Sequence, residues 1–532
     1  MGRDSETGWN IAGPLFQTAQ TVPDHPAVVV GKATLSYAEL ARSASALARV
    51  LRPRLVTRRV GILATRSLAA YQGIAGAAWA GATYVPLNLK WPAERLVALM
   101  KELALDALVV DRNGARLLDR AVLEAAPKLI IASDDAAAVP GALRIGELED
   151  RGIEAPAPMP AEHSAYIMFT SGSTGLPKGV VVSCGSLAAY LHETRKWAGF
   201  TTADRVAEAH DVTFDLSVHN MFLAFEAGAT LHIMSTLDMM APQRFVRSNE
   251  ITAWMSVPTI VAMMRANGLL KDGLFPSLRL SVFCGEPLPI PAVEAWARAA
   301  PNSVVENIYG PTECTVVCMR QRLTDPPVAT PKRNILAIGR PYDNFRVALF
   351  DGDQKPVPRG EIGEIALSSA QLSDGYFGKP ELTADRFRMI NGERWYLTGD
   401  LGVEDENGVF HHMGRADNQI KLKGNRIELE EVEMHLRRTA GTDLASVVAW
   451  PIVDGSAQGL VAFIAGKDGD GAALQQAMMQ SLPRYMVPQR VVFAERLPQN
   501  ANGKTDRRAL AAWLDTDSAK GDAETSPQAV VA

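Results

Sequence analysis

Short apolar runs alternate with amphipathic stretches from the start of the chain to about Phe283, and this alternation constrains the fold more than any other feature. Runs such as Val60–Leu63 and Ala107–Val110 have the length of buried strands, and the stretches between them have the length of helices. One of those stretches opens at Ser36, with Glu39 at the spacing of a helix capping box. Regular alternation of strands and helices is typical of parallel sheets covered by helices. We therefore predict an α/β fold with two sheet subdomains here.

The pattern changes further along the chain. From Ile338 to Phe410, short apolar runs are separated by Gly, Asp and Pro turns, which is typical of a small β-rich, barrel-like subdomain. After Gly414 the chain carries more charge, and Ile427–Arg438 has the pattern of an amphipathic helix. We therefore predict a large α/β domain at residues 1–416, a small α+β domain at 417–515 and a disordered tail at 516–532.

The composition of the 532-residue chain excludes several classes of protein. Hydrophobic residues make up 47% and charged residues 21%, which is the balance of a globular chain rather than a disordered one. The formal net charge of −5 gives no basic excess, so we expect no nucleic-acid partner and no membrane binding. The most apolar stretch, Ala70–Leu87, contains Gln72 and three glycines, which predicts a buried helix, turn and strand. Four cysteines and the lack of a secretory signal favour the cytoplasm.

The segment Thr170–Gly179 (TSGSTGLPKG) is the strongest local signal of function. It follows the apolar run Ala165–Phe169, its glycines allow an anion to approach the backbone, and its hydroxyls and Lys178 are phosphate donors. A Walker A loop is excluded, because Pro177 stands where that motif needs glycine. A plain Ser/Gly turn is the alternative on composition alone.

The segment resembles the phosphate-binding loop of the adenylate-forming superfamily, which includes acyl-CoA synthetases, luciferases and the adenylation domains of nonribosomal peptide synthetases. Five further segments resemble motifs of that superfamily and occur in its order: residues 307–313 (NIYGPTE), 396–400 (YLTGD), 414–421 (GRADNQIK), 482–488 (LPRYMVP) and 497–504 (LPQNANGK). The resemblance extends over about residues 30–510. The chain is identified as a member of this superfamily, and a freestanding amino-acid adenylation enzyme is the member type that it resembles most.

The resemblance implies a binding site for ATP. The residues expected to hold the nucleotide are Thr170, Ser171, Gly172, Ser173, Thr174, Gly175, Lys178, Gly285, Glu286, Pro287, Asn307, Tyr309, Gly310, Asp400 and Arg415. Within this set Tyr309 is expected to lie against the adenine, and Asp400 to accept hydrogen bonds from the ribose. Three residues are expected to act in catalysis: Lys504 as the catalytic lysine, Thr312 as a donor to the α-phosphate, and Glu313 as the ligand of Mg²⁺.

The resemblance also implies that the small domain at residues 417–515 is mobile, which gives the enzyme a second conformation. Asp417 occupies the hinge position of the superfamily, where a short polar residue can absorb a large change in backbone angles. Lys423 and Gly424 are expected to lie beside the tunnel for a phosphopantetheine thiol, where glycine leaves room for the thiol arm.

The segment Phe214-Asp215-Leu216 resembles the substrate motif of amino-acid-activating members, in which the aspartate pairs with the α-ammonium group. The other expected pocket residues are His219, Met255, Val282, Cys284, Ile308, Val316 and Val317. This lining is apolar apart from His219 and a thiol, so a small or medium aliphatic amino acid fits best, with proline as the first hypothesis. Two alternatives stay open: Asp215 as a helix N-cap, and His219 as a residue that bridges helices.

The predicted function is ATP-dependent formation of an aminoacyl-AMP and transfer of the amino acid to the phosphopantetheine thiol of a carrier protein, in natural-product biosynthesis of the nonribosomal-peptide type, such as antibiotic biosynthesis. The alternatives are a CoA ligase, a D-alanine-type carrier protein ligase and a non-catalytic binding module. The chain length leaves room for one adenylation unit, so we expect the carrier protein to be a separate molecule. His411 and His412 lie on a predicted strand and point to opposite faces, so they are not expected to share a metal ion.

Overall fold

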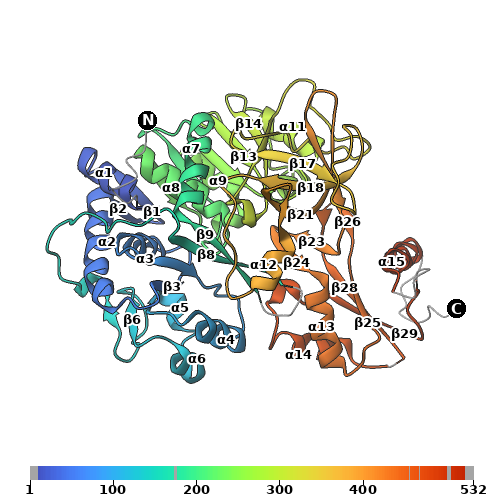
Figure 1. Cartoon of the computed structure of the whole chain (residues 1–532), viewed down its shortest axis with the longest axis horizontal. Helices are drawn as coiled ribbons and strands as arrows, with labels where there is room; N and C mark the ends of the chain where they lie inside the picture. The colour runs from blue at the N-terminus through green and yellow to red at the C-terminus, as the bar shows by residue number, and fades with distance from the viewer. Residues whose placement is uncertain (1–9, 173–176, 454–455, 467, 500–504, 522–532) are drawn as a thin grey trace. The chain divides into compact units, whose positions relative to one another are not determined.

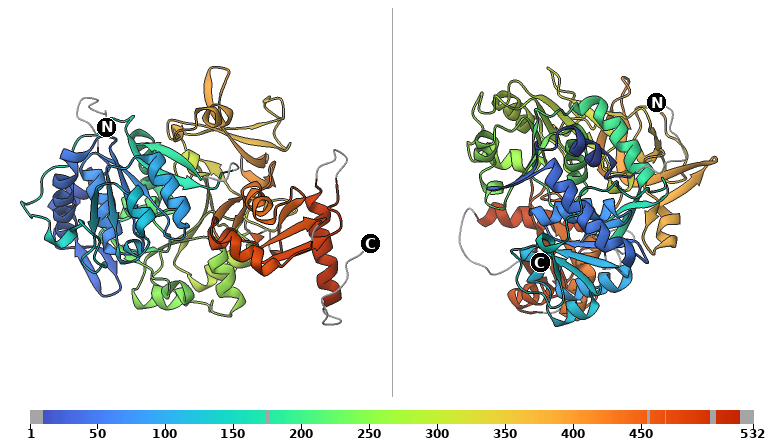
Figure 2. Two further views of the ribbon diagram at one scale, coloured as in Figure 1. Left: turned by 90° about the horizontal axis from the view of Figure 1, so that it is seen from below. Right: turned by 90° about the vertical axis from the view of Figure 1, so that its left-hand side faces the viewer.

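The computed structural model describes residues 10–172, 177–453, 456–466, 468–499 and 505–521, and for 516–521 it describes the backbone alone. The chain divides into two compact units. The first comprises Met1–Leu89, Leu96–Phe169 and Gly179–Ala416, and the second comprises Lys90–Arg95, Thr170–Lys178 and Asp417–Ala532. Figures 1 and 2 show the chain coloured along its sequence.

The first unit contains a nine-stranded sheet built mainly from parallel strands. Its order is β16 (Arg340–Pro341), β15 (Met319–Arg322), β14 (Val304–Tyr309), β13 (Leu280–Phe283), β12 (Ala253–Ser256), β10 (Arg205–Glu208), β11 (Thr230–Ile233), β1 (Pro26–Val30) and β2 (Ala33–Ser36). The strands from β14 to β1 pair in parallel, whereas β15, β16 and β2 are antiparallel additions at the two edges. Strands buried on both faces explain the continuous apolar runs in the sequence.

A second, eight-stranded sheet carries the strands on either side of the Thr170–Gly179 segment. Its order is β19 (Gly375–Tyr376), β9 (Lys178–Ser183), β8 (Ser164–Thr170), β4 (Thr83–Pro86), β3 (Arg59–Leu63), β5 (Ala107–Val110), β6 (Leu129–Ala132) and β7 (Leu143–Arg144). Strand β8 ends at Thr170 and β9 begins at Lys178, so these two strands precede and follow the segment along the chain. The predicted strands at Val60–Leu63 and Ala107–Val110 are confirmed as β3 and β5.

Helices lie between these sheets and cover them. The helices of this part of the chain are α1 (Gly13–Thr21), α2 (Tyr37–Leu51), α3 (Leu68–Trp79), α4 (Ala93–Leu103), α5 (Arg112–Ala115), α6 (Arg120–Ala125), α7 (Cys184–Ala198), α8 (Leu216–Ala227), α9 (Pro242–Ser248), α10 (Pro258–Ala266), α11 (Ile290–Ala299) and α12 (Pro380–Arg386). Helix α3 contacts β1 of one sheet and β3, β4 and β5 of the other, so it packs between them, beside α2 (Figure 1). The capping box is confirmed: Ser36 accepts from the N–H of Glu39, and the Glu39 carboxylate accepts from the N–H of Ser36. The predicted buried helix, turn and strand are confirmed as α3 and β4.

The β-rich region of the first unit forms one antiparallel sheet. It runs in the order β17 (Arg346–Phe350), β18 (Gly363–Ser368), β21 (Glu393–Glu404) and β20 (Phe387–Ile390), and β22 (Phe410–Arg415) pairs with β21. Strand β21 carries the TGD segment, and β22 carries the residues that precede the second unit.

The second unit has two small sheets and three helices in its C-terminal part, as far as the chain is described. One sheet orders β24 (Asn425–Glu428), β23 (Gln419–Leu422), β27 (Ser456–Ala457) and β26 (Ile452–Val453), and the other orders β25 (Ala445–Ala449), β28 (Leu460–Ala465) and β29 (Arg490–Ala494). The helices are α13 (Leu429–Ala440), α14 (Gly471–Met478) and α15 (Arg507–Gly521). The prediction of an α/β fold with a small α+β C-terminal part is confirmed.

Three boundaries differ from the predictions. The amphipathic helix starts at Leu429 instead of Ile427, because Asn425–Glu428 pairs as β24 with β23. The tail does not start at Thr516: α15 continues to Gly521, since no glycine or proline interrupts residues 507–520. Two short segments before residue 416, Lys90–Arg95 and Thr170–Lys178, group with the second unit. Within that unit Glu431 pairs with Arg95.

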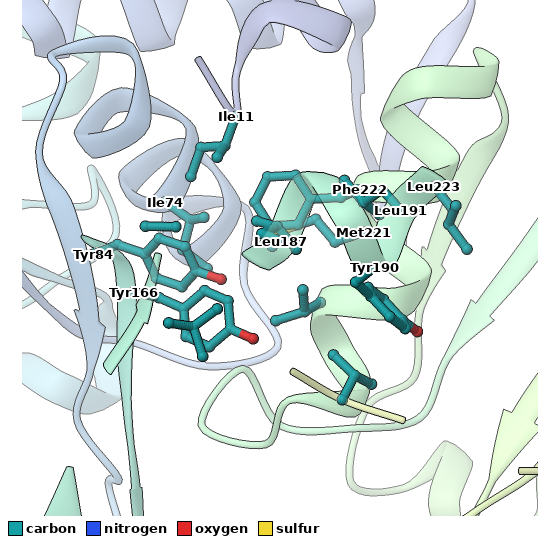
Figure 3. Close-up of a cluster of buried hydrophobic side chains, with 14 of the residues drawn as sticks. Ile11, Ile74, Tyr84, Tyr166, Leu187, Tyr190, Leu191, Met221, Phe222 and Leu223 are labelled. Carbon is teal, nitrogen blue, oxygen red and sulfur yellow. The ribbon is translucent and has the colours of Figure 1, made fainter. Parts of the chain in front are cut away.

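The described residues form separate hydrophobic cores. The largest fills the first unit from Ile11 to Phe410 and includes the aromatic cluster of Tyr84, Tyr166 and Phe222 (Figure 3). A second core, which contains Trp254 and Trp296, covers the opposite face of the nine-stranded sheet. The C-terminal part of the second unit has its own core. Among the described residues no helix has the length and hydrophobicity needed to cross a bilayer.

Candidate active site

Asp400 is the centre of a polar cluster in the first unit. Its carboxylate accepts a hydrogen bond from the Tyr309 hydroxyl at 2.5 Å and forms an ion pair with Arg415 at 2.6 Å. The His412 ring lies 3.4 Å from the same carboxylate, and its centroid is 6.3 Å from that of Tyr309. Asp400 is 6% exposed, so these interactions occur in a largely buried site. The structure thus brings together Tyr309, Asp400 and Arg415, three of the residues expected to hold adenosine.

Strand pairing explains how these distant residues meet. Tyr309 is the last residue of β14, and Asp400 on β21 lies opposite Arg415 on β22. Gly399 has a φ of 75°, a conformation that favours glycine, and the β21–β22 register shifts one residue after Asp400. Burial raises the pKa of Tyr309 well above its usual value, and the Asp400 carboxylate adds to the shift. Tyr309 therefore stays a neutral donor.

Two other expected nucleotide residues have partners within the protein. Asn307 donates to the carbonyl of Ala337 at 2.8 Å, and Glu286 accepts from the N–H and hydroxyl of Thr259, in the first turn of α10. The first bond joins β14 to the segment at Ala337, and the second joins the segment after β13 to α10. Their contacts with adenine remain predictions.

Glu313 lies in the short helical turn η4 (Thr312–Cys314), directly after β14. Its side chain is fully buried and accepts a hydrogen bond from the Tyr376 hydroxyl at 2.8 Å. A carboxylate oxygen is a ligand that Mg²⁺ prefers, and the ion needs only one or two protein carboxylates when phosphates complete its coordination. The residue therefore fits the predicted metal role. Thr312, which opens η4, is half-buried.

The residues of the phosphate loop belong to the second unit. The Thr170 hydroxyl is buried without a hydrogen-bond partner in the described chain, which suits a phosphate donor. Ser171 donates to the carbonyl of Arg426, Gly172 donates through its N–H to Glu431, and Lys178 lies 3.7 Å from Glu428. Their phosphate contacts remain predictions. Ser173, Thr174, Gly175 and the predicted catalytic Lys504 lie outside the described residues.

The expected side-chain pocket lies on one face of the nine-stranded sheet. Met255 on β12 pairs in register with Val282 on β13, and Ile308 on β14 points to the same face, two residues beyond the partner of Val282. The expected residues are nearly all buried, and the apolar ones belong to the largest core: Leu216, Met255, Val282, Cys284, Ile308, Val316 and Val317. Phe214 is half-buried just before α8.

Asp215 stands at the N-cap position of α8, as the capping alternative predicted. Its side chain, however, makes no capping hydrogen bond. Its negative charge is felt by groups around it. Burial is the main cause that raises the pKa of Tyr84, Tyr166 and Cys314 well above their usual values, and the charge of Asp215 adds to each shift. Figure 3 shows the hydroxyl oxygens of Tyr84 and Tyr166 pointing the same way. The carboxylate is therefore close to a region of low dielectric constant.

His219, one helical turn after Asp215, bridges two helices. Its Nδ1 lies 2.6 Å from the hydroxyl of Tyr190 on α7, and the rings of Trp197 and Phe200 lie against it. Burial lowers the pKa of His219 from 6.5 to about 3, so the ring is neutral near pH 7. The bridging alternative is therefore observed, and a contact between His219 and substrate remains a prediction.

Val316 and Val317 lie in a tight turn between η4 and β15. The turn packs on Gly310, where a Cβ atom would lie 2.4 Å from Cα of Val317 and 2.8 Å from Sγ of Cys314. Gly310 is thus needed for the close approach of two backbone segments, in addition to its expected place at the nucleotide.

Comparison with known proteins identifies the family. Residues 15–377 match the AMP-binding enzyme family, and residues 431–504 match the C-terminal domain of AMP-binding enzymes. The chain belongs to the AMP-binding enzyme family. Among its relatives, the AMB antimetabolite synthetase AmbB of Pseudomonas aeruginosa is 35% identical over 515 residues, which cover 93% of this chain and 38% of AmbB. Novobiocin biosynthesis protein H of Streptomyces niveus is 33% identical, over 93% of this chain and 81% of that protein.

Solved structures of AMP-binding enzymes agree with this fold. The adenylation domain AlmE of Vibrio cholerae, in complex with glycyl-adenosine-5'-phosphate, superimposes with a TM-score of 0.86 at 32% identity, over 97% of this chain and 99% of that one. IdnL7 superimposes with a TM-score of 0.71 at 30% identity, over 96% and 99% of the two chains. The first curated relatives are longer proteins: this chain spans 38% of AmbB and 7% of tyrocidine synthase 3 from Brevibacillus parabrevis.

Two residues of this AMP-binding enzyme were missed from the sequence. His412 was predicted only to point away from His411. The two side chains do point to different partners, His411 to Asp405 and His412 to Asp400. Pairing of the strands that carry the two segments could have placed His412 beside the Asp400 motif. Gln371 contacts the Val316–Val317 turn from a separate segment, and no local sequence signal marks it.

The hinge and thiol-tunnel residues have well-defined local structure. Asp417 accepts a hydrogen bond from the N–H of Gln419 at 3.1 Å. Lys423 and Gly424 form the two-residue turn between β23 and β24, with φ values of 51° and 79°, as in a type I′ hairpin. Their roles in domain movement and thiol delivery remain predictions. In the described part of the chain, no three or more His, Cys, Asp or Glu side chains gather to hold a metal ion.

Proposed function

We propose that this AMP-binding enzyme activates an amino acid as its aminoacyl-AMP and passes it to the phosphopantetheine thiol of a carrier protein. The position of Asp215 carries the proposal. It lies at the start of α8, half-buried, and its charge reaches Tyr84, Tyr166 and Cys314 inside the core. An ion pair with an α-ammonium group is strong in such surroundings, and an acid that lacks the amine leaves the carboxylate without that cation.

The proposed substrate class is a small or medium aliphatic amino acid, with proline as the first candidate. The expected side-chain pocket consists of Met255, Val282, Ile308 and their buried neighbours, which supply no charge for a charged substrate side chain. His219 is neutral, and its ring nitrogen already interacts with Tyr190. The complex of AlmE with glycyl-adenosine-5'-phosphate supports a small amino acid as well.

In the first proposed step, the substrate carboxylate attacks the α-phosphorus of ATP. An oxygen–phosphorus bond forms, the bond to the bridging α–β oxygen breaks, and pyrophosphate leaves with its electron pair. Tyr309, Asp400 and Arg415 would hold the nucleoside, and Thr312 would donate to the α-phosphate. Bound at Glu313, Mg²⁺ would neutralise phosphate charge. Lys504, by its motif, would stabilise the negative charge that develops during the attack.

In the second proposed step, the carrier thiol attacks the carbonyl carbon of the aminoacyl-AMP. A thioester forms, the bond between the carbonyl carbon and the phosphate oxygen breaks, AMP leaves with that electron pair, and the thiol proton is released to solvent. The hairpin turn at Lys423 and Gly424 is the proposed edge of the thiol path.

Amino-acid-dependent exchange of pyrophosphate into ATP tests the first step. A panel of amino acids is compared with fatty acids and aryl acids. We expect exchange with small aliphatic amino acids, and exchange with fatty or aryl acids alone would overturn the proposal. For the second step, a phosphopantetheinylated carrier protein and free CoA are offered as competing acceptors, and preferential loading of CoA would contradict the carrier role.

Asp215→Asn tests the proposed role of the carboxylate with a side chain of the same shape. We expect kcat/KM for the amino acid to fall by about 100-fold or more, because an ion pair beside the apolar core is lost. KM for ATP should change little. The control Asp343→Asn, at a side chain that is 89% exposed, should behave like the wild type. If Asp215→Asn retains normal activity, the assignment of this carboxylate is wrong.

A further inference from the structure

The backbone of the turn before β15 is unusual in the first unit. Thr315 has φ and ψ of 61° and 80°, and Val316 has a φ of 72°. The N–H of Val317 donates to the carbonyl of Thr315 at 3.1 Å, the pattern of a γ-turn with a positive φ at its centre, which is the rare and strained form. Residues with a β-branched side chain rarely adopt positive φ. Surrounding groups must therefore hold this turn in place.

Gln371 supplies the donors that hold the turn. Its side-chain amide nitrogen lies 2.9 Å from the carbonyl oxygen of Cys314, 3.2 Å from that of Thr315 and 2.8 Å from that of Val317. In return, the hydroxyl of Thr315 donates to the carbonyl of Gln371 at 2.6 Å. The Gln371 side chain is fully buried. Three carbonyl groups of one strained turn thus share one amide group.

Only a donor fits this position. Carbonyl oxygens accept hydrogen bonds and never donate them, so the group that faces all three must carry N–H bonds. The other end of the amide accepts a hydrogen bond from Asn344 at 3.1 Å, which fixes its orientation. Gln371 lies after β18, in a segment separate from both β14 and β15, so it ties the turn to another part of the first unit.

We propose that Gln371 is a positioning residue that determines amino-acid specificity, because it fixes the backbone from which Val316 and Val317 form the wall of the side-chain pocket. This inference rests on the proposed function, in that it assigns a pocket wall to those two residues. Gly310 packs against the turn, and Gln371 donates hydrogen bonds to its carbonyl groups. If the amide donors are removed, the turn relaxes and the wall moves while the nucleotide cluster around Asp400 keeps its own bonds.

Gln371→Met removes the donors and keeps most of the side-chain volume, and Gln371→Glu replaces them with oxygens that repel the three carbonyl groups. We expect KM for the preferred amino acid to rise by about 10- to 100-fold, since small displacements of a positioning group have effects of this size. KM for ATP should stay within about twofold, and the ratio of activity with bulkier amino acids to activity with the preferred one should rise.

The matched control is Gln72→Met on α3, where the glutamine donates to Ser43 and lies outside the turn. It should keep the wild-type amino-acid profile. Thermal unfolding is measured for every variant, and Gln371→Met alone decides the test if Gln371→Glu does not fold. A fall in activity that is equal for all amino acids, or that comes with an unchanged KM for the amino acid, would overturn the proposal.

If the proposed amino-acid activation is wrong, the wild-type enzyme itself gives a different result. In that case the wild type activates no amino acid but activates another carboxylic acid. The comparison of KM for that acid with KM for ATP in Gln371→Met then decides whether Gln371 positions a pocket wall.

Discussion

His219 shows how strongly burial controls the chemistry of a single residue. Its ring is 1% exposed, lies against Tyr190, Trp197 and Phe200, and also feels the positive charge of His210 when that residue is protonated. Removal from water lowers the pKa of His219 to about 3, against 6.5 when the residue is exposed. In the unfolded chain His219 is therefore protonated below about pH 6.5, whereas in the folded chain it stays neutral until about pH 3.

Neutral His219 makes the free energy of unfolding depend on pH. The contribution of neutral His219 to stability is fully present above pH 6.5 and is lost as the pH falls from 6.5 towards 3. Between pH 7.5 and 4.5 the neutral state of this one residue should cost about 3 kcal/mol of unfolding free energy. In His219→Phe that part of the pH dependence should be absent, whatever the variant's stability at neutral pH. Urea unfolding followed by tryptophan fluorescence at both pH values provides the comparison.

His232→Phe serves as a second probe in the same unit, because burial lowers the pKa of His232 to about 4. It should also flatten the pH dependence. Should His219→Phe lose as much stability as the wild type between these pH values, the buried imidazole is not neutral.

Some of the predicted site residues lie together in the structure for a physical reason. Asp400 and Arg415 belong to short motifs on neighbouring strands, and an antiparallel pair brings such motifs face to face. Gln371 could not be predicted, because its role depends on three carbonyl groups, and backbone carbonyls are present at every position of every sequence. Asp215 was found through its motif, but only the structure shows that it does not cap α8.

At the scale of elements, the end of β14 and the following turn are in close contact. A Cβ atom on residue 310 would lie 2.4 Å from Cα of Val317 and 2.9 Å from the carbonyl oxygen of Val316. Both are backbone atoms, and Gln371 binds three carbonyl groups of the same turn, so the turn cannot move away easily.

Gly310→Ala should therefore destabilise the first unit and disable the site together. We expect a loss of about 1–3 kcal/mol in stability, the usual effect of overpacking, and a fall of at least about tenfold in pyrophosphate exchange. Gly352→Ala is the matched control, since a Cβ atom there meets no atom within 4 Å. Its stability should stay within about 0.5 kcal/mol of the wild type. Normal exchange by Gly310→Ala would show that the turn is more adaptable than its packing indicates.

Helix boundaries were predicted correctly where they depend on interactions between neighbouring residues. The capping box at Ser36 and Glu39 marks the start of α2 correctly, because capping depends on adjacent residues. The start of α13 was misplaced, since Asn425–Glu428 pairs with a strand that is identified only by tertiary structure. The disordered tail was predicted from Thr516 because that stretch lacks periodicity, but α15 continues to Gly521.

At the scale of the whole molecule, the two units have separate cores, one around Tyr84 and Phe222 and one around Leu436 and Ile464. The sequence predicted a boundary at Asp417 and a catalytic lysine in the C-terminal part. The superfamily resemblance implies that the C-terminal part serves the two half-reactions in two conformations, and Lys504 should matter in one of them alone.

Lys504→Ala tests this division of labour. Adenylation should fall by about 100-fold or more, because a charge that stabilises the transition state is removed. Thioester formation from a supplied aminoacyl-AMP should stay within a few-fold of the wild type. Lys355→Ala, at a side chain that is 75% exposed, is the control for loss of a lysine. Equal losses in both half-reactions would contradict a lysine that acts in the first alone.

The apolar residues expected to line the pocket, among them Met255, Ile308 and Val317, are also members of the largest core of the first unit. A change that enlarges the pocket for a new substrate removes buried volume from the same core, and a change that narrows it overfills that core. A substitution at one of these residues should therefore change both the substrate range and the thermal stability of this enzyme. Libraries for altered substrate choice should begin from a stabilised parent, and natural shifts of specificity in such a pocket should be accompanied by compensating replacements elsewhere in the core.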